Sequence, residues 1–521
     1  MSETPPHDTA DVLVVGSGIA GCAAALQAAR EDAEVLLVTK AERPADASTD
    51  WAQGGISTAR GDPEALKRDV LAASDGTADP DAVDVLVDEA DAAVEDVLLE
   101  TLGIGFDERA DGAFDYAREA AHSERRILHV DAATGTHILH PFLNYLDDHE
   151  RVEVRQDTAV LELIAHEGRV RGVLTDEDAT GHPVYAGATV LATGGIGALY
   201  PRSTNPEGAT GDGIAMAALA GADVADLEYV QFHPTAYAGD DPFLLSEALR
   251  GEGAVLRNGD GDRFMDDYHP DAELAPRDVV ARAVETEREE TGEVLLDVRT
   301  LEGGFEDEFP GIAESCRDRG IDGDEIPVAP CEHFLCGGID VDHHGRTSIE
   351  GLYAVGECAR TGVHGANRLA STSLLEGLVW GLRAGEDAGS ELRCTLTRRG
   401  GTAEHAEPAA VEAPTLRDSD PALPERFAAE KFARLQRTMG DELGLERDPD
   451  GIARASAVLR RLKGEVDAYT RTRTSRELYE LRNACVTALL IARAAGENGE
   501  SRGCHHLVRE DAPTAEPEAP R

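Results

Sequence analysis

The stretch "DVLVVGSGIAGCAAAL" at residues 11–26 constrains the fold of this chain more than any other. Four apolar residues at 12–15 are typical of a buried parallel strand, and a G-x-G-x-x-G pattern follows at 16–21. Here Gly16 permits a tight turn, Gly18 lets the backbone approach a pyrophosphate, and Gly21 lets the helix lie close to the strand. The N–H groups that begin this helix then face the phosphates. The segment predicts a βαβ unit that binds a dinucleotide; the alternative is an ordinary glycine-rich turn.

The next predicted strand, "AEVLLVTK" at 33–40, departs from the usual pattern at its end. It closes on Thr39-Lys40, where dinucleotide folds usually place an acidic residue for the adenosine ribose. We therefore expect the ribose contact to come either from the backbone or from Lys40.

Two later strands indicate which dinucleotide is bound. "ATVLATGGIG" at 188–197 and "GLYAVGECA" at 351–359 are apolar runs that end in glycines, the second in Gly356-Glu357. They resemble the second and third FAD-contacting segments of flavoproteins with two dinucleotide folds, in which the carboxylate reaches the ribityl chain. Three such segments favour FAD over NAD; the alternative is three unrelated strands that happen to end in glycine.

Length and charge exclude several classes of protein. A chain of 521 residues is too long for one core, so two or three domains are expected. The net charge is −52, with 101 acidic and 49 basic residues, which argues against nucleic acid or an anionic membrane as a partner. Acidity spread this evenly is typical of proteins from salt-loving cells. No run of 18 apolar residues is present, and the start "MSETPPHDTAD" lacks the blocks of a signal peptide, so we expect a cytoplasmic protein.

The eight cysteines do not predict a metal or iron–sulfur site. Cys331 and Cys336 lie five apart beside His333, which is why a metal site must be considered. Zinc sites usually combine such a spacing with a second close pair, and none is present. We expect no metal and most cysteines buried as small apolar residues.

Collinear motifs over residues 10–510 resemble the flavoprotein family of succinate dehydrogenase and fumarate reductase subunits, most closely its L-aspartate oxidase branch. The motifs are "STDWAQGG" (48–55), "REAAHSERRILHVDAATG" (118–135), "TGDGIAMA" (210–217), "QFHPT" (231–235), "SEALRGEGA" (246–254), "ELAPRDVVARA" (273–283), "EHFLCGGI" (332–339), "HGANRLASTSLLEG" (364–377) and "ESRGCHH" (500–506).

The resemblance and the sequence patterns together predict an α/β protein. We expect a Rossmann-like two-dinucleotide FAD-binding fold, an inserted α+β capping domain and a C-terminal helical bundle. The expected bounds are 1–232 and 336–400 for the split FAD domain, 233–335 for the cap, 399–424 for a Pro-, Ala- and acid-rich linker, 425–508 for the bundle and 509–521 for a disordered tail.

The same resemblance assigns the site residues. A dicarboxylate needs cations and hydrogen-bond donors, and Arg and His supply them. The matching carboxylate binders are His233, Ser246, His333 and Arg368, and the matching proton-transfer group is Arg277 with Glu247 and Arg250 as its relay. A guanidinium has a pKa above about 12 in water, so Arg277 needs such a relay; a helix-start ion pair with Asp278 or Glu273 is its alternative role. The expected FAD contacts are Gly16, Ser17, Gly18, Ile19, Ala20, Gly21, Lys40, Ser48, Thr49, Asp50, Trp51, Ala52, Gln53, Gly54, Gly55, Val160, Thr193, Gly194, Asp212, Glu357, Ser373 and Leu374.

Residues 117–129, "AREAAHSERRILH", favour aspartate over succinate as the substrate. Aspartate carries an ammonium, so its site needs one carboxylate, and Glu119 matches the acidic residue that L-aspartate oxidases place there. We expect His122 to bind substrate and Arg125 and Arg126 to offset the dicarboxylate charge. The segment reads Glu-Ala-Ala-His instead of the family's Glu-Gly-Gly-His, and the two methyls could shift the loop. A solvated helix face with Glu–Arg pairs is the alternative.

The resemblance finally implies an activity. No His precedes Ala52-Gln53, where succinate dehydrogenases attach FAD covalently, so FAD is expected to be non-covalent. We expect oxidation of L-aspartate to iminoaspartate, with hydride passing to flavin N5 and oxygen or fumarate as the acceptor, as the first step of de novo NAD biosynthesis. Transient contact with quinolinate synthase, which uses the product, is also expected. The rivals are a soluble fumarate reductase and a flavin subunit that needs an iron–sulfur partner.

Overall fold

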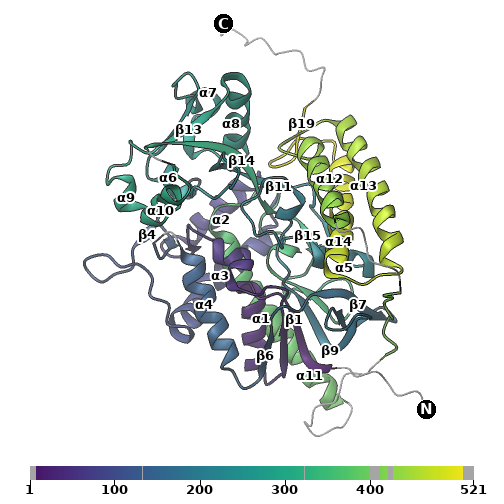
Figure 1. The fold of residues 1–521 in the computed structure, drawn as a ribbon. Helices are drawn as coiled ribbons and strands as arrows, with labels where there is room; N and C mark the ends of the chain where they lie inside the picture. Colours follow the sequence, from purple (N-terminus) through teal and green to yellow (C-terminus); the bar gives the residue numbers. More distant parts are fainter. Residues whose placement is uncertain (1–7, 132, 322, 399–410, 420–425, 509–521) are drawn as a thin grey trace, which may run out of the picture.

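The computed structural model describes residues 8–131, 133–321, 323–398, 411–419 and 426–508 (Figure 1). At its centre lies a seven-stranded sheet in the order β6-β2-β1-β9-β8-β7, with β16 pairing with β9. Strands β6, β2, β1, β9 and β16 are parallel, whereas β7 and β8 are antiparallel. The strands are β1 (Asp8–Val15), β2 (Val35–Val38), β6 (Val152–Arg155), β7 (Val160–His166), β8 (Arg169–Thr175), β9 (His182–Leu191) and β16 (Leu352–Ala354). The parallel part confirms the predicted dinucleotide-binding fold and brings residue 352 beside the N-terminal half of the chain.

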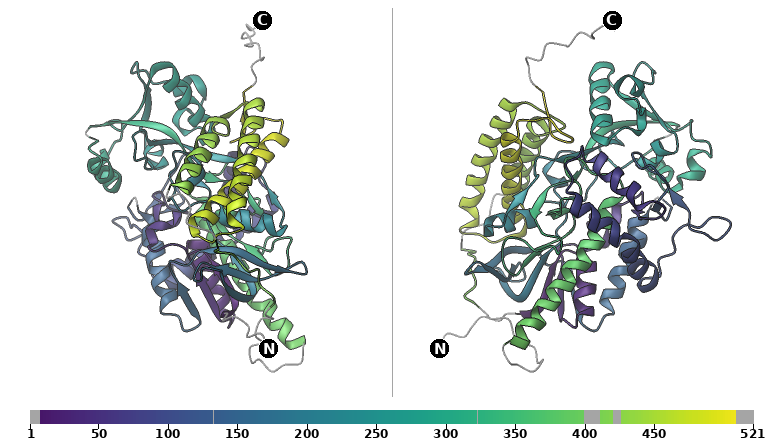
Figure 2. Two further views of the ribbon diagram at one scale, coloured as in Figure 1. Left: turned by 45° about the vertical axis from the view of Figure 1, so that its right-hand side comes forward. Right: turned by 180° about the vertical axis from the view of Figure 1, so that it is seen from behind.

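Small residues hold two helices against each other on one face of this sheet. Helix α1 (Ile19–Arg30) packs along α11 (Thr372–Arg398), as both views in Figure 2 show. A Cβ on Gly381 or Gly385 would overlap the carbonyl oxygens of Ala20 or Ala24, so the two backbones approach more closely than larger side chains would permit. Helices α2 (Pro63–Ala73), α3 (Pro80–Ala93) and α4 (Thr134–Asp147) and the π-helix η3 (Val94–Thr101) complete this apolar layer.

A second unit with its own core is inserted between β9 and β16. Its antiparallel sheet has the order β11-β14-β13-β12. The elements are β11 (Val230–Tyr237), α6 (Glu247–Gly251), β12 (Val255–Asn258), α7 (Met265–Tyr268), α8 (Arg277–Thr291), β13 (Val294–Asp297), α9 (Phe305–Glu308), α10 (Pro310–Asp318) and β14 (Glu325–Leu335). Leu249, Val280, Leu296 and Ile326 are buried together in its core. The first and last strands, β11 and β14, pair with each other at the base of this cap.

The C-terminal helices form a bundle on the other side of the sheet, drawn in yellow in Figure 1. They are α12 (Phe427–Glu442), α13 (Pro449–Thr470) and α14 (Arg476–Glu497), and α14 also packs on α5 (Asp212–Ala220). Asp448 and Ser475 cap α13 and α14 by accepting from backbone N–H groups of the first turn. In the predicted linker, residues 411–419 are described, and Leu416 packs against Leu174 and Tyr479. The rest of the linker at 399–410 and 420–424, and the predicted tail at 509–521, lie outside the described residues.

Short elements connect these units. They are η1 (Pro44–Asp46), η2 (Ser48–Trp51), β3 (Ile56–Ser57), β4 (Tyr116–Ala117), β5 (Ile127–Leu128), η4 (Gly197–Leu199), β10 (Val224–Ala225), η5 (Ala272–Leu274), β15 (Gly338–Asp340), η6 (Gly356–Cys358), β17 (Ala359–Arg360), β18 (Glu446–Arg447) and β19 (His506–Leu507). Within the described part of the chain, no helix has the length and apolar character needed to cross a membrane.

Candidate active site

A cavity of about 790 Å³ opens at the carboxyl ends of β1, β9 and β16. Its wall contains residues from all three glycine-ended segments, and the cap completes it with Leu244, Ser246, Glu247 and Arg277. His233 and His333, on the two strands at the base of the cap, also line it. In open α/β sheets the carboxyl ends of the strands are the usual place for a bound nucleotide, so this cavity is the candidate active site.

The glycine turn at 16–21, in the wall of the cavity, has the geometry of a pyrophosphate-binding loop, called here the cradle. Gly16 adopts φ 111°, and a Cβ there would overlap the carbonyl oxygen of Ala192. A Cβ on Gly21 would overlap the carbonyl oxygen of Gly16. Thr49 Oγ1 accepts from the backbone N–H of Ile19 at 3.1 Å, which fixes the following loop against the start of α1. The residues present therefore fit the pyrophosphate of a dinucleotide.

Most of the expected FAD contacts line the cavity. Those that do are Gly16, Ser17, Gly18, Ile19, Ala20, Lys40, Ser48, Thr49, Trp51, Ala52, Gly55, Val160, Thr193, Gly194, Asp212, Glu357, Ser373 and Leu374. Gly21 and Gly54 lie just behind the lining, and Gly54 faces Glu119. Gln53 is not among the residues that line the cavity. Asp50 is not brought to the cavity, because its carboxylate pairs with His140 at 3.1 Å.

Lys40 is already engaged by acid groups. Its Nζ lies 2.6 Å from Asp212 and 2.8 Å from Glu480, and these acids raise its pKa although burial opposes them. Glu480 comes from α14, in the C-terminal bundle, and its neighbour Arg476 also lines the cavity. No local pattern around Lys40 signals these contacts, because Asp212 lies 172 residues and Glu480 lies 440 residues further along the chain.

Two carboxyl groups with raised pKa values lie at the third glycine-ended segment: Glu357, which is half-buried and lines the cavity, and the buried Glu332. Glu357 accepts from the backbone N–H of Leu335 at 3.0 Å, and burial followed by the charge of Glu332 raises its pKa to about 8. Burial also raises the pKa of Glu332 to about 7, although Ser203 donates to it at 2.6 Å. A buried carboxyl at Glu332 is a feature that sequence reasoning missed.

The predicted carboxylate binders form one cluster, the clamp, whose cation is Arg368. The rings of His233 and His333 meet edge to face at 5.1 Å, and Arg368 Nη2 donates to His333 Nε2 at 2.8 Å. Burial, and then the neighbouring arginines, hold the pKa of both histidines well below the usual range. Ser246 lines the same space and caps α6 by accepting from the N–H of Ala248. The structure thus brings these four predicted residues together.

The predicted relay is also assembled. Arg277 Nε donates to Glu247 Oε2 at 2.5 Å, and Arg250 lies 3.1 Å from Glu247 Oε1. Burial alone would raise the pKa of Glu247, but the two arginines outweigh it and lower the pKa. Arg277 also donates to Gln231 Oε1 at 2.9 Å, a contact the sequence did not predict.

The alternative role for Arg277 is wrong. Asp278 pairs with Arg282, and Glu273 pairs with Arg263, so neither acid forms a helix-start ion pair with Arg277.

Glu119 is buried and lies in a loop between β4 and β5, so the alternative of a solvated helix face is wrong. Its side chain lines the cavity and its residue is 3% exposed. Burial and then the charge of Glu247 raise its pKa to about 7, while a hydrogen bond from Ser371 opposes the shift. Glu119 Oε2 has no partner among the described residues. Ala121 adopts φ 63°, the left-handed region that a glycine would occupy without strain.

The rest of the 117–129 segment is placed differently from the expectation. His122 is buried behind the cavity wall and donates from Nε2 to the carbonyl of Ala370 at 3.0 Å, so it is not placed to contact substrate. Arg125 extends to Glu252 at the surface. Arg126 is fully buried and lies 3.5 Å from Asp69. These three side chains hold the loop that carries Glu119, because each bonds to a group outside the cavity lining.

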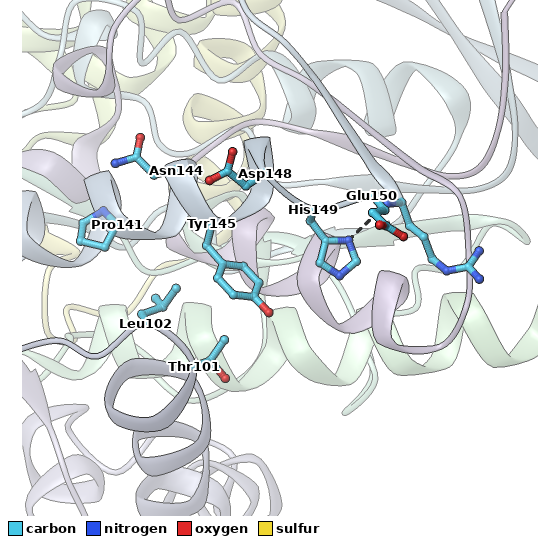
Figure 3. A pocket seen from close by; sticks show the side chains of 9 residues that line it. Thr101, Leu102, Pro141, Asn144, Tyr145, Asp148, His149 and Glu150 are labelled. Carbon is cyan, nitrogen blue, oxygen red and sulfur yellow. Dashed lines mark hydrogen bonds between the residues drawn. The ribbon is translucent and has the colours of Figure 1, made fainter.

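A second hollow, of about 630 Å³, lies at the surface where η3 and α4 end (Figure 3). Tyr145 and His149 face it, and His149 Nδ1 accepts from the backbone N–H of Arg151. Arg151 itself pairs with Glu34, so its charge is compensated. Seven cysteines are buried, namely Cys22, Cys316, Cys331, Cys336, Cys358, Cys485 and Cys504. The described residues hold no group of three or more His, Cys, Asp or Glu placed to bind a metal ion.

Comparison with known proteins agrees with this geometry. Residues 11–374 match the FAD binding domain family, and residues 432–519 match the fumarate reductase flavoprotein C-terminal family. The chain is 67% identical to an L-aspartate oxidase of Halobacterium salinarum, over 98% of this chain and 99% of that protein. It is 41% identical to one of Streptomyces coelicolor, over 96% and 90%. Among solved structures, it resembles the FrdA chain of E. coli quinol fumarate reductase (TM-score 0.84, 29% identity, 96% and 91% coverage) and Mycobacterium smegmatis Sdh1 (TM-score 0.79, 30% identity, 96% and 89% coverage).

Proposed function

The chain belongs to the L-aspartate oxidase family of FAD-binding flavoproteins, and from this premise we propose that it oxidises L-aspartate to iminoaspartate. The product is the starting compound of NAD biosynthesis through quinolinate. The observation that carries the choice of substrate is Glu119, a buried carboxyl group with a free oxygen that lines the same cavity as Arg277, Arg368, His233 and His333. Its buried neighbour Glu247 is instead paired with Arg277 and Arg250. A dicarboxylate without an amine needs no such group, whereas the ammonium of aspartate does.

The cradle at Gly16, Gly18 and Gly21 and the carboxyl group of Glu357 would hold FAD. When bound, FAD supplies the acceptor for the hydride that leaves the substrate. Among the described residues lining the cavity, the only histidines are His233 and His333, which belong to the clamp, so a non-covalent cofactor fits this site.

The protein's own part in the reaction follows from its charges. Arg368, His233 and His333 orient the substrate carboxylates, and Arg277 faces the same space with Glu247 and Arg250 behind it. Holding cations in a buried site strengthens their attraction for the dicarboxylate. Arg277 is connected to Glu247 by a 2.5 Å hydrogen bond, which gives a proton a route from Arg277 away from the reacting carbon.

A comparison of substrates tests the proposal. Purified protein is assayed for peroxide with L-aspartate, and for flavin reduction with L-aspartate or succinate under nitrogen. We expect both signals with L-aspartate; turnover of succinate alone would instead identify a soluble fumarate reductase. Turnover of aspartate by the isolated chain, with oxygen or fumarate as acceptor, would exclude a subunit that depends on an iron–sulfur partner.

Three further aspects are part of this proposal. The charge of −52 and the Halobacterium relative support adaptation to high salt. Fumarate and oxygen both remain candidate acceptors. Cytoplasmic location is a prediction from the sequence alone. A brief contact with quinolinate synthase is a prediction that rests on the chemistry of the unstable imine product.

A further inference from the structure

The hydrogen bonds of His333 define where its proton lies. Arg368 Nη2 is 2.8 Å from His333 Nε2, and a guanidinium can only donate, so Nε2 accepts. A neutral ring then carries its hydrogen on Nδ1. The partner of Nδ1 is the hydroxyl of Thr204, at 2.7 Å. That hydroxyl accepts from Nδ1–H and donates in turn to the carbonyl of Glu332 at 3.3 Å.

His233 is arranged in the opposite way. The backbone N–H of Thr235 donates to His233 Nδ1 at 3.2 Å, so the hydrogen of a neutral ring lies on Nε2. His233 Nε2 is buried and has no partner among the described residues. A backbone N–H cannot become an acceptor, so His233 is a fixed donor for a carboxylate.

A substrate carboxylate accepts hydrogen bonds and donates none. His333 can help to bind one only if its Nε2 carries a hydrogen, which is the reverse of the arrangement with Arg368. Its Nδ1 must then accept from a donor. The hydroxyl of Thr204 is in place to be that donor because it can rotate, whereas a backbone amide could not serve both tautomers.

We propose that Thr204 is a positioning residue for His333. The hydroxyl of Thr204 accepts from Nδ1–H of His333 when Arg368 donates to Nε2. The same hydroxyl donates to Nδ1 when Nε2–H is offered to a substrate carboxylate. One proton leaves Nδ1 and one arrives at Nε2, both exchanged with water, so the ring stays neutral. Thr204 is 6% exposed and lines the cavity. Its loop is anchored by Asn205, which donates to the carbonyl of His333 at 2.9 Å, and this fixes the hydroxyl opposite the ring.

The test uses Thr204→Val, which keeps the shape but removes the hydroxyl, and Thr204→Ser, which restores it. The inference rests on the proposed function only for the identity of the substrate, so two measurements are made on the holoenzyme. One is KM and kcat with L-aspartate. The other is the Kd of succinate, followed through the absorbance of the flavin, which needs no turnover.

We expect Thr204→Val to raise both KM and Kd about 10- to 100-fold, the effect of losing one hydrogen bond at a buried group, with a much smaller change in kcat. Thr204→Ser should restore both to near wild type. Thr286→Val is the matched control, because it is the same substitution at a hydroxyl that donates to the carbonyl of Arg282, away from the cavity lining; it should leave KM and Kd unchanged.

Unchanged KM and Kd in Thr204→Val, or no recovery in Thr204→Ser, would overturn the inference. If Thr204→Val does not load FAD, Thr204→Ala is measured in its place with the same criteria. If the wild-type protein binds succinate but does not oxidise aspartate, the proposed function fails, and the succinate data alone decide the role of Thr204.

Discussion

The carboxyl group of Glu119 occupies the space that a side chain at residue 54 would need. A Cβ on Gly54 would overlap Glu119 Oε1, and Ser371 Oγ lies 3.3 Å from the same point. The absence of a side chain at Gly54 therefore sets the position of the one acidic group that recognises the substrate amine. Gly54 was predicted from its motif to contact FAD, and the structure also places it against the side chain of Glu119.

Gly54→Ala should displace the carboxyl group of Glu119 without removing it. We expect KM for aspartate to rise about tenfold or more, since a misplaced charge pair loses at least about 1.4 kcal/mol. Steady-state kinetics and the FAD content of the purified variant measure this. Gly105→Ala is the control, because a Cβ there meets no atom within 4 Å. Wild-type KM in Gly54→Ala would show that the position of Glu119 does not matter.

Glu119→Gln should weaken the binding of aspartate more than the binding of succinate. It removes the charge that faces the ammonium while keeping the size of the side chain, so aspartate should lose about 10- to 100-fold in affinity, as expected for a charge-assisted hydrogen bond. Succinate should bind equally well or better, because repulsion of its carboxylates is relieved. Titration of the flavin absorbance with each ligand measures both. Equal losses for the two ligands would contradict the assigned role.

The affinity for aspartate should depend on pH near neutrality. Glu119 has a pKa raised to about 7 from 4.5 by burial and Glu247, although Ser371, Arg277 and Arg368 oppose the shift. The ionised form pairs with the ammonium, so kcat/KM should rise as the pH passes from about 6 to about 8 and then level off. Glu119→Gln should lack this rise. A wild-type profile that falls over the same range would refute the assignment.

The same shift predicts an effect on stability with the opposite sign. Because the pKa of this acid is higher in the folded state, the folded state binds more protons between pH 4.5 and about 7. The contribution of Glu119 to stability therefore falls as the pH rises through this window. Glu119→Gln should raise Tm relative to wild type above pH 7, and this difference should vanish below pH 4.5.

Arg277→Lys should impair turnover more than binding. A lysine keeps the charge but cannot donate to both Glu247 and Gln231 with the geometry of a guanidinium. We expect kcat to fall about 10²- to 10⁴-fold, the range for loss of a general acid or base. The Kd of succinate should change far less. Stopped-flow reduction of the flavin by aspartate measures the chemical step directly, and an unchanged rate there would remove Arg277 from proton transfer.

Salt should stabilise this protein strongly. With a net charge of −52, self-repulsion is screened as the Debye length falls from about 10 Å at 0.1 M to about 3 Å at 1 M salt. Tm should increase over this range of KCl concentration. Sucrose of equal osmolality is the control, because it is excluded from protein surfaces without screening charge. Equal effects of KCl and sucrose would argue against electrostatic screening.

Local sequence patterns predicted the fold well. The strand, turn and helix at 11–26 and the periodic helices α13 and α14 are specified by residues close together in the chain, so the pattern of those residues is enough to recognise them. The same holds for Glu247 and Arg250, which are three apart on one helical turn.

The failures share a physical cause, which is a partner distant in sequence. His122 lies in the right motif but bonds to Ala370, 248 residues away. Thr204 reaches His333 across 129 residues, and Lys40 reaches Glu480 across 440. Such partners depend on how β14, α11 and α14 pack against the sheet, and no local pattern records that packing.

The contact of Lys40 with Glu480 has a consequence for any attempt to shorten the protein. Glu480 and Arg476 belong to the last helix, and both stand beside the nucleotide cradle built by the first forty residues. A truncated chain without that helix would leave Lys40 and Asp212 exposed at the mouth of the site, so retention of the cofactor would suffer. It would also uncover the apolar core that the helix covers, so solubility would fall. Binding of the cofactor therefore depends on residues from both the N-terminal and the C-terminal part of the chain, because both contribute to the same wall of the cavity.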